Sequence, residues 1–149
     1  MIKLVVFDWN GVLIADTQAC VDGNNYILKM FGGRPGNIKK FRDTYIIPLV
    51  EHYVLNGCDR ENILSKPEKI GRLFHEFYEK RVSRCRSRKG AKQTLEHLKK
   101  KSIKSIILSN HMKTKIISQL KRLGLSEHIS EILSNTVLHD PLNQNSTGL

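Results

Sequence analysis

The segment VVFDWNGVL, residues 5–13, joins an apolar run suited to burial directly to a charged side chain. That side chain is Asp8, which Trp9, Asn10 and Gly11 follow. Burying an unpaired carboxylate is costly, so a buried strand does not end in aspartate by default. Asp8 is therefore either a turn residue that faces water at a strand end or a side chain whose charge is used in chemistry.

A second apolar run, IKSIIL at 103–108, is similar to the first, IKLVVF at 2–7: both have β-branched residues and little alternation. This pattern predicts two strands that are buried on both faces of a parallel sheet. The second run ends at Ser109 and Asn110. Ligands of such sheets bind beyond the carboxyl ends of the strands, so we expect Asp8 and Ser109 to share one edge.

About ninety residues of helical character separate the two predicted strands. The pattern predicts one helix over 16–31 and another over 38–55 that is bent or interrupted at Pro48. A third helix begins at the capping box Ser65-Lys66-Pro67-Glu68. We interpret the apolar stripe of this third helix as a packing surface; it consists of Ile70, Leu73, Phe74, Phe77, Tyr78 and Val82.

After the helical region the sequence returns to an alternation of elements. Helices are predicted over 90–101 and over 113–124, the second ending at Gly124, with a short strand near 129–133. Alternating strands and helices with buried strands predict an α/β fold, a parallel sheet flanked by helices.

Composition sets the broad class of the protein. The chain has 149 residues, 40% of them hydrophobic, which is enough for a real core. No apolar run approaches the ~20 residues that a membrane helix needs, so we expect no membrane association. The three cysteines form no Cys-x-x-Cys pair. This usage argues against a disulfide framework or a zinc site and predicts a cytoplasmic location.

The formal net charge is +11, and the densest basic cluster is KRVSRCRSRK at 80–89. Such a cluster could hold a phosphate-bearing substrate or nucleic acid. No interleaved aromatic residues or nucleic-acid motif accompany it, so we interpret it as a solvated surface. Nucleic-acid binding stays a minor hypothesis. It predicts salt-dependent binding that weakens when the cluster's arginines are neutralised.

Together, VVFDWNGVL, the helical insert, LSN at 108–110 and RLGLSEHISEILS at 122–134 resemble the haloacid dehalogenase (HAD) superfamily. The resemblance implies a Rossmann-like core with an inserted helical cap. The core would be 1–14 with 88–149, and the cap 15–87. It also implies a hydrolase, and specifically a magnesium-dependent phosphatase that acts on a small phosphorylated metabolite.

The resemblance also implies roles for individual residues. Asp8 would be the nucleophile and would form an aspartyl-phosphate. The Asp8 carboxylate and the Asn10 backbone carbonyl would hold Mg²⁺. Ser109 would hydrogen-bond a phosphate oxygen through its hydroxyl and the adjacent N–H of Asn110, and Gly11 would allow backbone donors to approach the anion.

One residue departs from the family pattern. Phosphatases of the family carry an acid–base aspartate two residues after the nucleophile, where this chain has Asn10. A carboxamide cannot exchange a proton at useful pH, so we expect at most slow phosphatase activity. Asp16 and His111 are candidate substitutes. Dehalogenase- or phosphonatase-type chemistry and an inactive phosphate-binding or regulatory protein are the alternatives.

Two family elements have no counterpart here. No lysine follows Arg122, and the surroundings of Asp140 do not resemble an acidic metal-binding loop. The chain is therefore expected to correspond to the first two-thirds of a HAD protein and to bind magnesium weakly. The first strand would then lie at an exposed edge of the sheet, which predicts self-association.

Trp9 is predicted to pack in the interior, with its indole N–H bonded to a partner.

Overall fold

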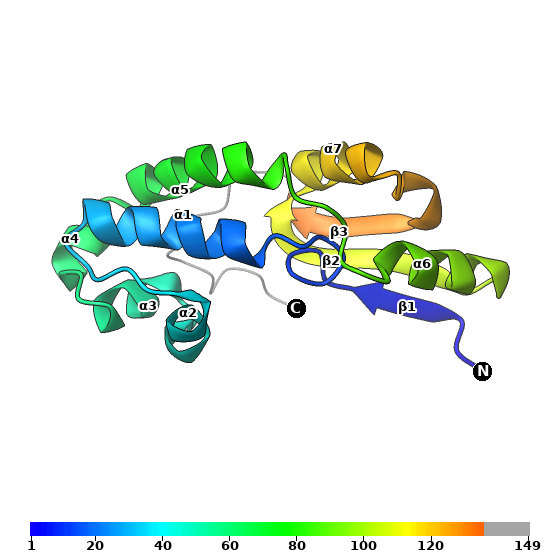
Figure 1. The fold of residues 1–149 in the computed structure, drawn as a ribbon, viewed down its shortest axis with the longest axis horizontal. Helices are drawn as coiled ribbons and strands as arrows, with labels where there is room; N and C mark the ends of the chain where they lie inside the picture. Colours follow the sequence, from blue (N-terminus) through cyan, green and yellow to red (C-terminus); the bar gives the residue numbers. More distant parts are fainter. Residues whose placement is uncertain (136–149) are drawn as a thin grey trace. The chain divides into compact units, whose positions relative to one another are not determined.

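The computed structural model of the protein describes residues 1–135, which form two compact units (Figure 1). Unit 1 consists of residues 1–16 and 83–135. Unit 2 consists of residues 17–82. The chain therefore leaves unit 1, forms unit 2 and returns. The predicted cap, 15–87, is a few residues longer at each end than unit 2.

Unit 1 contains a parallel sheet in the order β1-β2-β3. The strands are β1 (Leu4–Phe7), β2 (Lys104–Met112) and β3 (Glu131–Asn135). Two helices and a short 3₁₀ turn connect them: α6 (Ala91–Lys100), α7 (Lys113–Leu123) and η1 (Ser126–His128). This arrangement confirms the predicted α/β fold with a parallel sheet.

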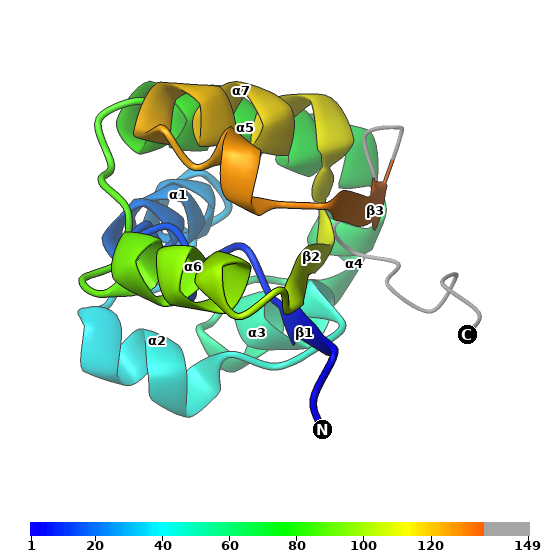
Figure 2. The same ribbon diagram turned by 90° about the vertical axis from the view of Figure 1, so that its right-hand side faces the viewer.

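Both helices of unit 1 lie on the same side of the sheet (Figure 2). The core between the two layers is formed by Leu95 of α6, Ile107 of β2 and Ile116 of α7, each of which is 0% exposed. Helix α7 ends at Gly124, as predicted, and the φ of 65° at this glycine lies in the left-handed region that favours glycine.

The opposite face of the sheet carries exposed apolar side chains beside Lys104 and Glu131. Leu4 and Val6 of β1 are 47% and 50% exposed, and Leu108 and Leu133 are 48% and 42% exposed. The strand register places these four side chains on one face. The prediction that β1 and β2 are buried on both faces is therefore wrong, because the helices of unit 1 in the described chain cover only the other face.

Strand β2 is longer than predicted. Its regular pairing with β3 ends at Ser109 opposite Ser134, and the next pair is Met112 with Asn135. Residues 110–111 therefore interrupt the ladder as a bulge, a feature that often redirects side chains near functional sites. Strand β3 begins two residues later than predicted, because residues 126–128 form the 3₁₀ turn and residues 129–130 follow it before the strand.

Backbone hydrogen bonds pair the two segments of unit 1 that directly precede and follow unit 2 in the sequence. The N–H of Ala15 donates to the carbonyl of Arg86 at 2.9 Å, and the N–H of Arg88 donates to the carbonyl of Leu13 at 2.9 Å. Ile14 and Ser87 form an antiparallel bridge between these bonds. Residues 13–15 and 86–88 therefore belong to unit 1 through their own hydrogen bonds.

Unit 2 is entirely helical in its regular structure. Its helices are α1 (Thr17–Met30), α2 (Ile38–Thr44), α3 (Leu49–Leu55), α4 (Arg60–Leu64) and α5 (Pro67–Val82). The predicted interruption at Pro48 is confirmed, because α2 and α3 are separate helices. Helix α4 was not predicted; its N-cap is Asp59, which accepts a hydrogen bond from the N–H of Asn62 at 2.8 Å.

The apolar stripe of α5 packs within unit 2, as predicted. Phe77 stacks on Tyr26 of α1 with ring centroids 4.7 Å apart, and Ile70 is 0% exposed. The helix begins at Pro67, within the predicted capping box, but the prediction that Ser65 caps it is wrong, because Ser65 is the C-cap of α4. The hydroxyl of Ser65 donates to the carbonyl of Asn62 in α4 at 3.1 Å.

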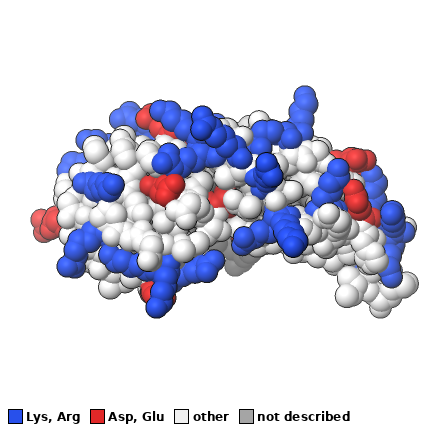
Figure 3. Space-filling view, in the orientation of Figure 1, with Lys and Arg blue, Asp and Glu red and all other residues white. Residues whose placement is uncertain are grey.

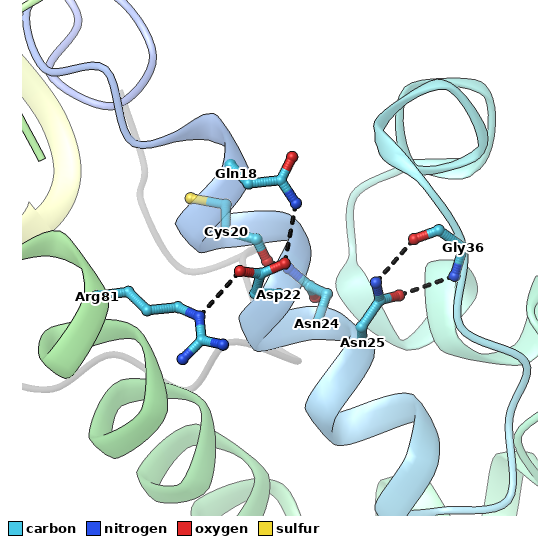
Figure 4. Close-up of polar contacts among 7 residues, drawn as sticks. All are labelled: Gln18, Cys20, Asp22, Asn24, Asn25, Gly36 and Arg81. Carbon is cyan, nitrogen blue, oxygen red and sulfur yellow. Dashed lines mark hydrogen bonds and ion pairs between the residues drawn. The ribbon is translucent and has the colours of Figure 1, made fainter.

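Polar contacts organise the exposed side of α1 (Figure 4). The Asp22 carboxylate accepts hydrogen bonds from Gln18 and from Arg81 of α5, both at 2.9 Å. The guanidinium of Arg81 also lies 4.2 Å from the centre of the Phe77 ring. This arginine of the basic cluster therefore contributes to packing within unit 2.

Basic side chains are spread over the face shown in Figure 3 and are not gathered into one stripe. This distribution agrees with the interpretation of the basic residues as a solvated surface. No helix within residues 1–135 has both the length and the apolar character needed to cross a membrane.

Candidate active site at the carboxyl edge of the sheet

The two predicted site motifs lie at one edge of the sheet in unit 1. Phe7, the last residue of β1, pairs with Ile107 of the adjacent parallel strand β2. Asp8 follows Phe7 directly, and Ser109 lies two residues after Ile107. Since parallel strands end at the same edge, the structure brings these two residues to the carboxyl edge of neighbouring strands.

The Asp8 side chain is exposed, and its carboxylate is oriented by the backbone of its neighbour. Asp8 Oδ1 accepts a hydrogen bond from the N–H of Trp9 at 2.7 Å. Surrounding protein atoms partly desolvate this exposed carboxylate and so raise the pKa of Asp8 above its usual value, and the charge of Asp16 adds to the increase against the opposing effect of the Trp9 N–H. A raised pKa makes the ionised carboxylate a better base and nucleophile.

The loop after Asp8 is a tight turn built around one carbonyl group. The carbonyl of Trp9 accepts hydrogen bonds from the N–H groups of Leu13 at 3.1 Å and Ile14 at 3.2 Å. Gly11 lies within this turn with a φ of 71°. Other residues rarely adopt that conformation, which explains why glycine occupies this position.

Asp16 binds this loop from within. It is 0% exposed. Its Oδ1 accepts from the N–H of Gly11 at 2.7 Å, and its Oδ2 accepts from the Nδ2 of Asn10 at 2.6 Å. The N–H of Gly11, a residue that the resemblance assigned to phosphate binding, is thus bonded to a protein carboxylate. Asp16 itself, a candidate substitute acid, accepts hydrogen bonds through both of its oxygens.

Ser109 is positioned by the bulge that follows it. It is 9% exposed, and its Oγ accepts a hydrogen bond from the N–H of His111 at 3.1 Å. The hydroxyl hydrogen can still donate to a ligand, because a serine hydroxyl donates and accepts. The carbonyl of Asn110 accepts from the Nδ2 of Asn135 at 2.9 Å, which fixes the bulge to the end of β3.

The family model for haloacid dehalogenase-like hydrolases matches residues 5–141 of the sequence. The chain belongs to this family. The match begins in β1 and includes both site motifs and all of unit 2. No curated protein matches the sequence significantly.

Solved structures with the same fold include three bacterial proteins. A predicted phosphoglycolate phosphatase from Haemophilus somnus 129pt is 20% identical with a TM-score of 0.72, over 93% of this chain and 65% of that protein. A haloacid dehalogenase-like family hydrolase from Streptococcus pneumoniae is 17% identical with a TM-score of 0.72, over 97% and 68% of the two chains. A predicted phosphatase from Clostridium acetobutylicum is 14% identical with a TM-score of 0.72, over 91% and 62%.

These similarities establish the fold of the haloacid dehalogenase-like chain. The chain spans about two-thirds of the length of each of these proteins, from 62% to 68%.

Trp9 connects the site loop of this haloacid dehalogenase-like chain to helix α7. The indole is 0% exposed, and its Nε1 donates to the Oε1 of Gln119 at 2.7 Å. Packing with a partner for the indole N–H was predicted, whereas the partner was not. The available signal was a glutamine between Ile116 and Leu120, on the apolar stripe of a predicted helix.

Few described residues can hold a divalent cation at this edge. No group of three His, Cys, Asp or Glu side chains suited to a metal occurs within residues 1–135. Asp16 is 0% exposed and its two oxygens accept hydrogen bonds from the loop, so Asp8 supplies the exposed carboxylate at this edge. Magnesium can be held by one carboxylate when substrate phosphate and water complete its octahedron. Asp140 lies outside the described residues.

Proposed function

We propose that this haloacid dehalogenase-like chain is a phosphatase of a small phosphorylated metabolite, with Asp8 as the nucleophile. The observation that carries the proposal is the pairing of β1 with β2, through which Asp8 and Ser109 occupy the carboxyl edge of adjacent parallel strands. Two of the structural neighbours are described as predicted phosphatases, which supports this class of substrate.

In the proposed reaction, an Asp8 carboxylate oxygen attacks the phosphorus atom of the ester. A new O–P bond forms, and the bond from phosphorus to the alcohol oxygen breaks with its electron pair. The Ser109 hydroxyl donates a hydrogen bond to a phosphate oxygen and holds the group in line. Water then attacks the phosphorus of the aspartyl-phosphate, which releases inorganic phosphate and regenerates Asp8.

The departing alcohol oxygen takes its proton from solvent in this scheme. Asn10 occupies the position of the family's acid–base aspartate, and its amide donates to Asp16 at 2.6 Å. General acid–base assistance contributes roughly 10²- to 10⁴-fold to such reactions. Turnover is therefore expected to be slower by about this factor than in a phosphatase with an aspartate at the position of Asn10.

Magnesium would be held by the Asp8 carboxylate and the Asn10 backbone carbonyl. When bound, it would offset the repulsion between the carboxylate and the phosphate. Because Asp8 provides one carboxylate, the affinity is expected to be weak without substrate phosphate.

A second candidate function is phosphate binding without turnover. The absence of turnover is favoured by the bond of the Asn10 amide to Asp16, which engages the side chain at the family's acid–base position. Dehalogenase- or phosphonatase-type chemistry is a third candidate, because relatives with those reactions also lack the second aspartate.

The test is hydrolysis of p-nitrophenyl phosphate with magnesium by the parent chain, Asp8→Asn and Asp59→Asn. Asp59 is a matched control because it caps a helix in unit 2, and asparagine caps a helix equally well. Turnover by the parent and Asp59→Asn but not by Asp8→Asn supports the proposal. Equal rates in all three reject it. Phosphate binding without turnover, or turnover of a 2-haloacid or phosphonoacetaldehyde instead, favours the respective alternative.

A further inference from the structure

We infer that Asp16 is a positioning residue for the Asp8 loop, and that it forms a matched pair with an amide at position 10. Only the predicted effect of Asp16 on turnover rests on the proposed function. The pairing itself follows from hydrogen-bond geometry within unit 1.

Asp16 is 0% exposed, so water cannot solvate its charge. A buried carboxylate must therefore be stabilised by donors, and two are within 2.7 Å: the Gly11 N–H and the Asn10 amide. These donors belong to the two residues that lie second and third after Asp8. The carboxylate therefore fixes both the backbone and the side chain of the nucleophile's loop.

The contact between Asn10 and Asp16 needs one donor and one acceptor. A carboxylate at position 10 would place two acceptors of the same charge about 2.6 Å apart. Carboxylates that share a site repel each other, and neither can donate in its ionised form. The Asn10 amide is therefore a chemical complement of the Asp16 carboxylate.

Exchanging Asn10 and Asp16 should preserve the hydrogen bond between these two positions. In Asp16→Asn, the single amide oxygen at position 16 can keep its bond to the Gly11 N–H, and the Asn10 amide must then turn over so that its oxygen faces the new NH₂. In Asn10→Asp/Asp16→Asn, the new amide at position 16 can donate to the new carboxylate at position 10. The exchanged chain keeps one donor and one acceptor. It also carries an aspartate two residues after the nucleophile.

The experiment is a double-mutant cycle on the full chain. It uses the parent, Asn10→Asp, Asp16→Asn and the double variant, with Asp59→Asn as the control carboxylate in unit 2. Urea unfolding gives the equilibrium constant for each protein. Asn10→Asp is expected to raise the unfolding constant roughly ten- to hundred-fold, because two acceptors then face each other, and Asp16→Asn is expected to raise it less, because the Asn10 amide can turn over to offer its oxygen. The double variant is expected to recover most of this loss, and Asp59→Asn to change little.

Two further readouts separate positioning from a purely structural role. The Gly11 amide resonance in ¹H–¹⁵N spectra should move in Asp16→Asn more than in Asp59→Asn. In p-nitrophenyl phosphate hydrolysis, Asp16→Asn should lower kcat roughly tenfold or more with KM nearly unchanged, because the loop of the nucleophile is affected. The double variant should recover kcat.

Additive losses in the stability cycle, with an unmoved Gly11 resonance, would overturn the inference even if the parent is a good phosphatase. Strong coupling in a chain that hydrolyses no phosphate ester would instead uphold the pair and reject the proposed function. If Asp16→Asn does not fold, rescue of folding in the double variant still supports the pair, and failure of the double variant to fold counts against it.

Discussion

The indole N–H of Trp9 donates to the amide oxygen of Gln119 at 2.7 Å, which joins residues 110 positions apart in the sequence. Trp9 directly follows the proposed nucleophile, and Gln119 lies on α7 with only 5% of its surface exposed. The bond therefore fixes one side of the site loop to the helical layer, whereas Asp16 fixes the loop from within.

Replacing Gln119 with leucine should leave a buried indole N–H without its acceptor. An unsatisfied buried donor costs about 1–3 kcal/mol, so the free energy of unfolding is expected to fall by about that amount. Urea unfolding measures the change. Gln93→Leu is the matched control, because Gln93 is exposed on α6 and should change stability little. Equal stability of the two variants would show that the Trp9 bond contributes nothing.

Stability should depend on pH through His52 in unit 2. The His52 ring is 1% exposed, and its Nδ1 lies 3.0 Å from the carbonyl of Thr44. Burial lowers the pKa of His52, and the charge of Lys40 adds to this effect against the Thr44 bond. The unfolded chain binds its proton near the usual pKa of about 6.5. The stabilisation by neutral His52 is therefore complete above pH 6.5 and is lost as pH falls from there toward the lowered pKa.

The variant His52→Gln should show a smaller loss of stability between pH 7.5 and pH 5 than the parent chain. Urea unfolding at a series of pH values measures this slope. His97→Gln removes an exposed histidine of α6 and should keep the parent's slope. A parent slope that survives in His52→Gln would assign the pH dependence to other groups.

The exposed apolar face of the sheet should promote self-association. Leu4, Val6, Leu108 and Leu133 share this face, and β1 is the edge strand of the described sheet. Patches of this kind and open strand edges favour association. Sedimentation velocity over a range of concentrations is expected to show species larger than the monomer, and Val6→Lys should reduce them.

The control for this surface is Ile117→Lys. Ile117 is 49% exposed, which is close to the 50% of Val6, but it lies on α7. It should leave the distribution of species as in the parent. A parent chain that is monomeric at all concentrations, or an equal effect of both lysine variants, would contradict the role of the sheet face.

Gly11→Ala should disturb the site loop through backbone strain. The φ of 71° lies in the region that costs a non-glycine residue about 1–3 kcal/mol. Gly32→Ala is a matched control in unit 2, because Gly32 has a φ of 78° and nothing lies within 4 Å of the added Cβ. Both variants should lose similar stability by thermal unfolding. Only Gly11→Ala should also lose phosphatase activity, and an equal loss in both would contradict a specific role of the loop.

Much of the fold could be predicted because local patterns decide it. The apolar runs at 2–7 and 103–108 predicted two parallel strands, which β1 and β2 confirm. The helix start at Pro67 and the helix end at Gly124 follow from backbone restrictions that these residues carry in any protein. The interruption at Pro48 follows in the same way.

The sequence by itself determined the order of the elements and the sheet edge at which Asp8 and Ser109 lie, since chain direction and residue type decide both. Only the tertiary structure decided which polar groups pair around them: Asp16 with Asn10 and Gly11, and Gln119 with Trp9. It also decided which face of β1 is covered. The physical reason is that a buried donor bonds to whichever acceptor packing brings within about 3 Å, and periodicity along one chain contains no information about that neighbour.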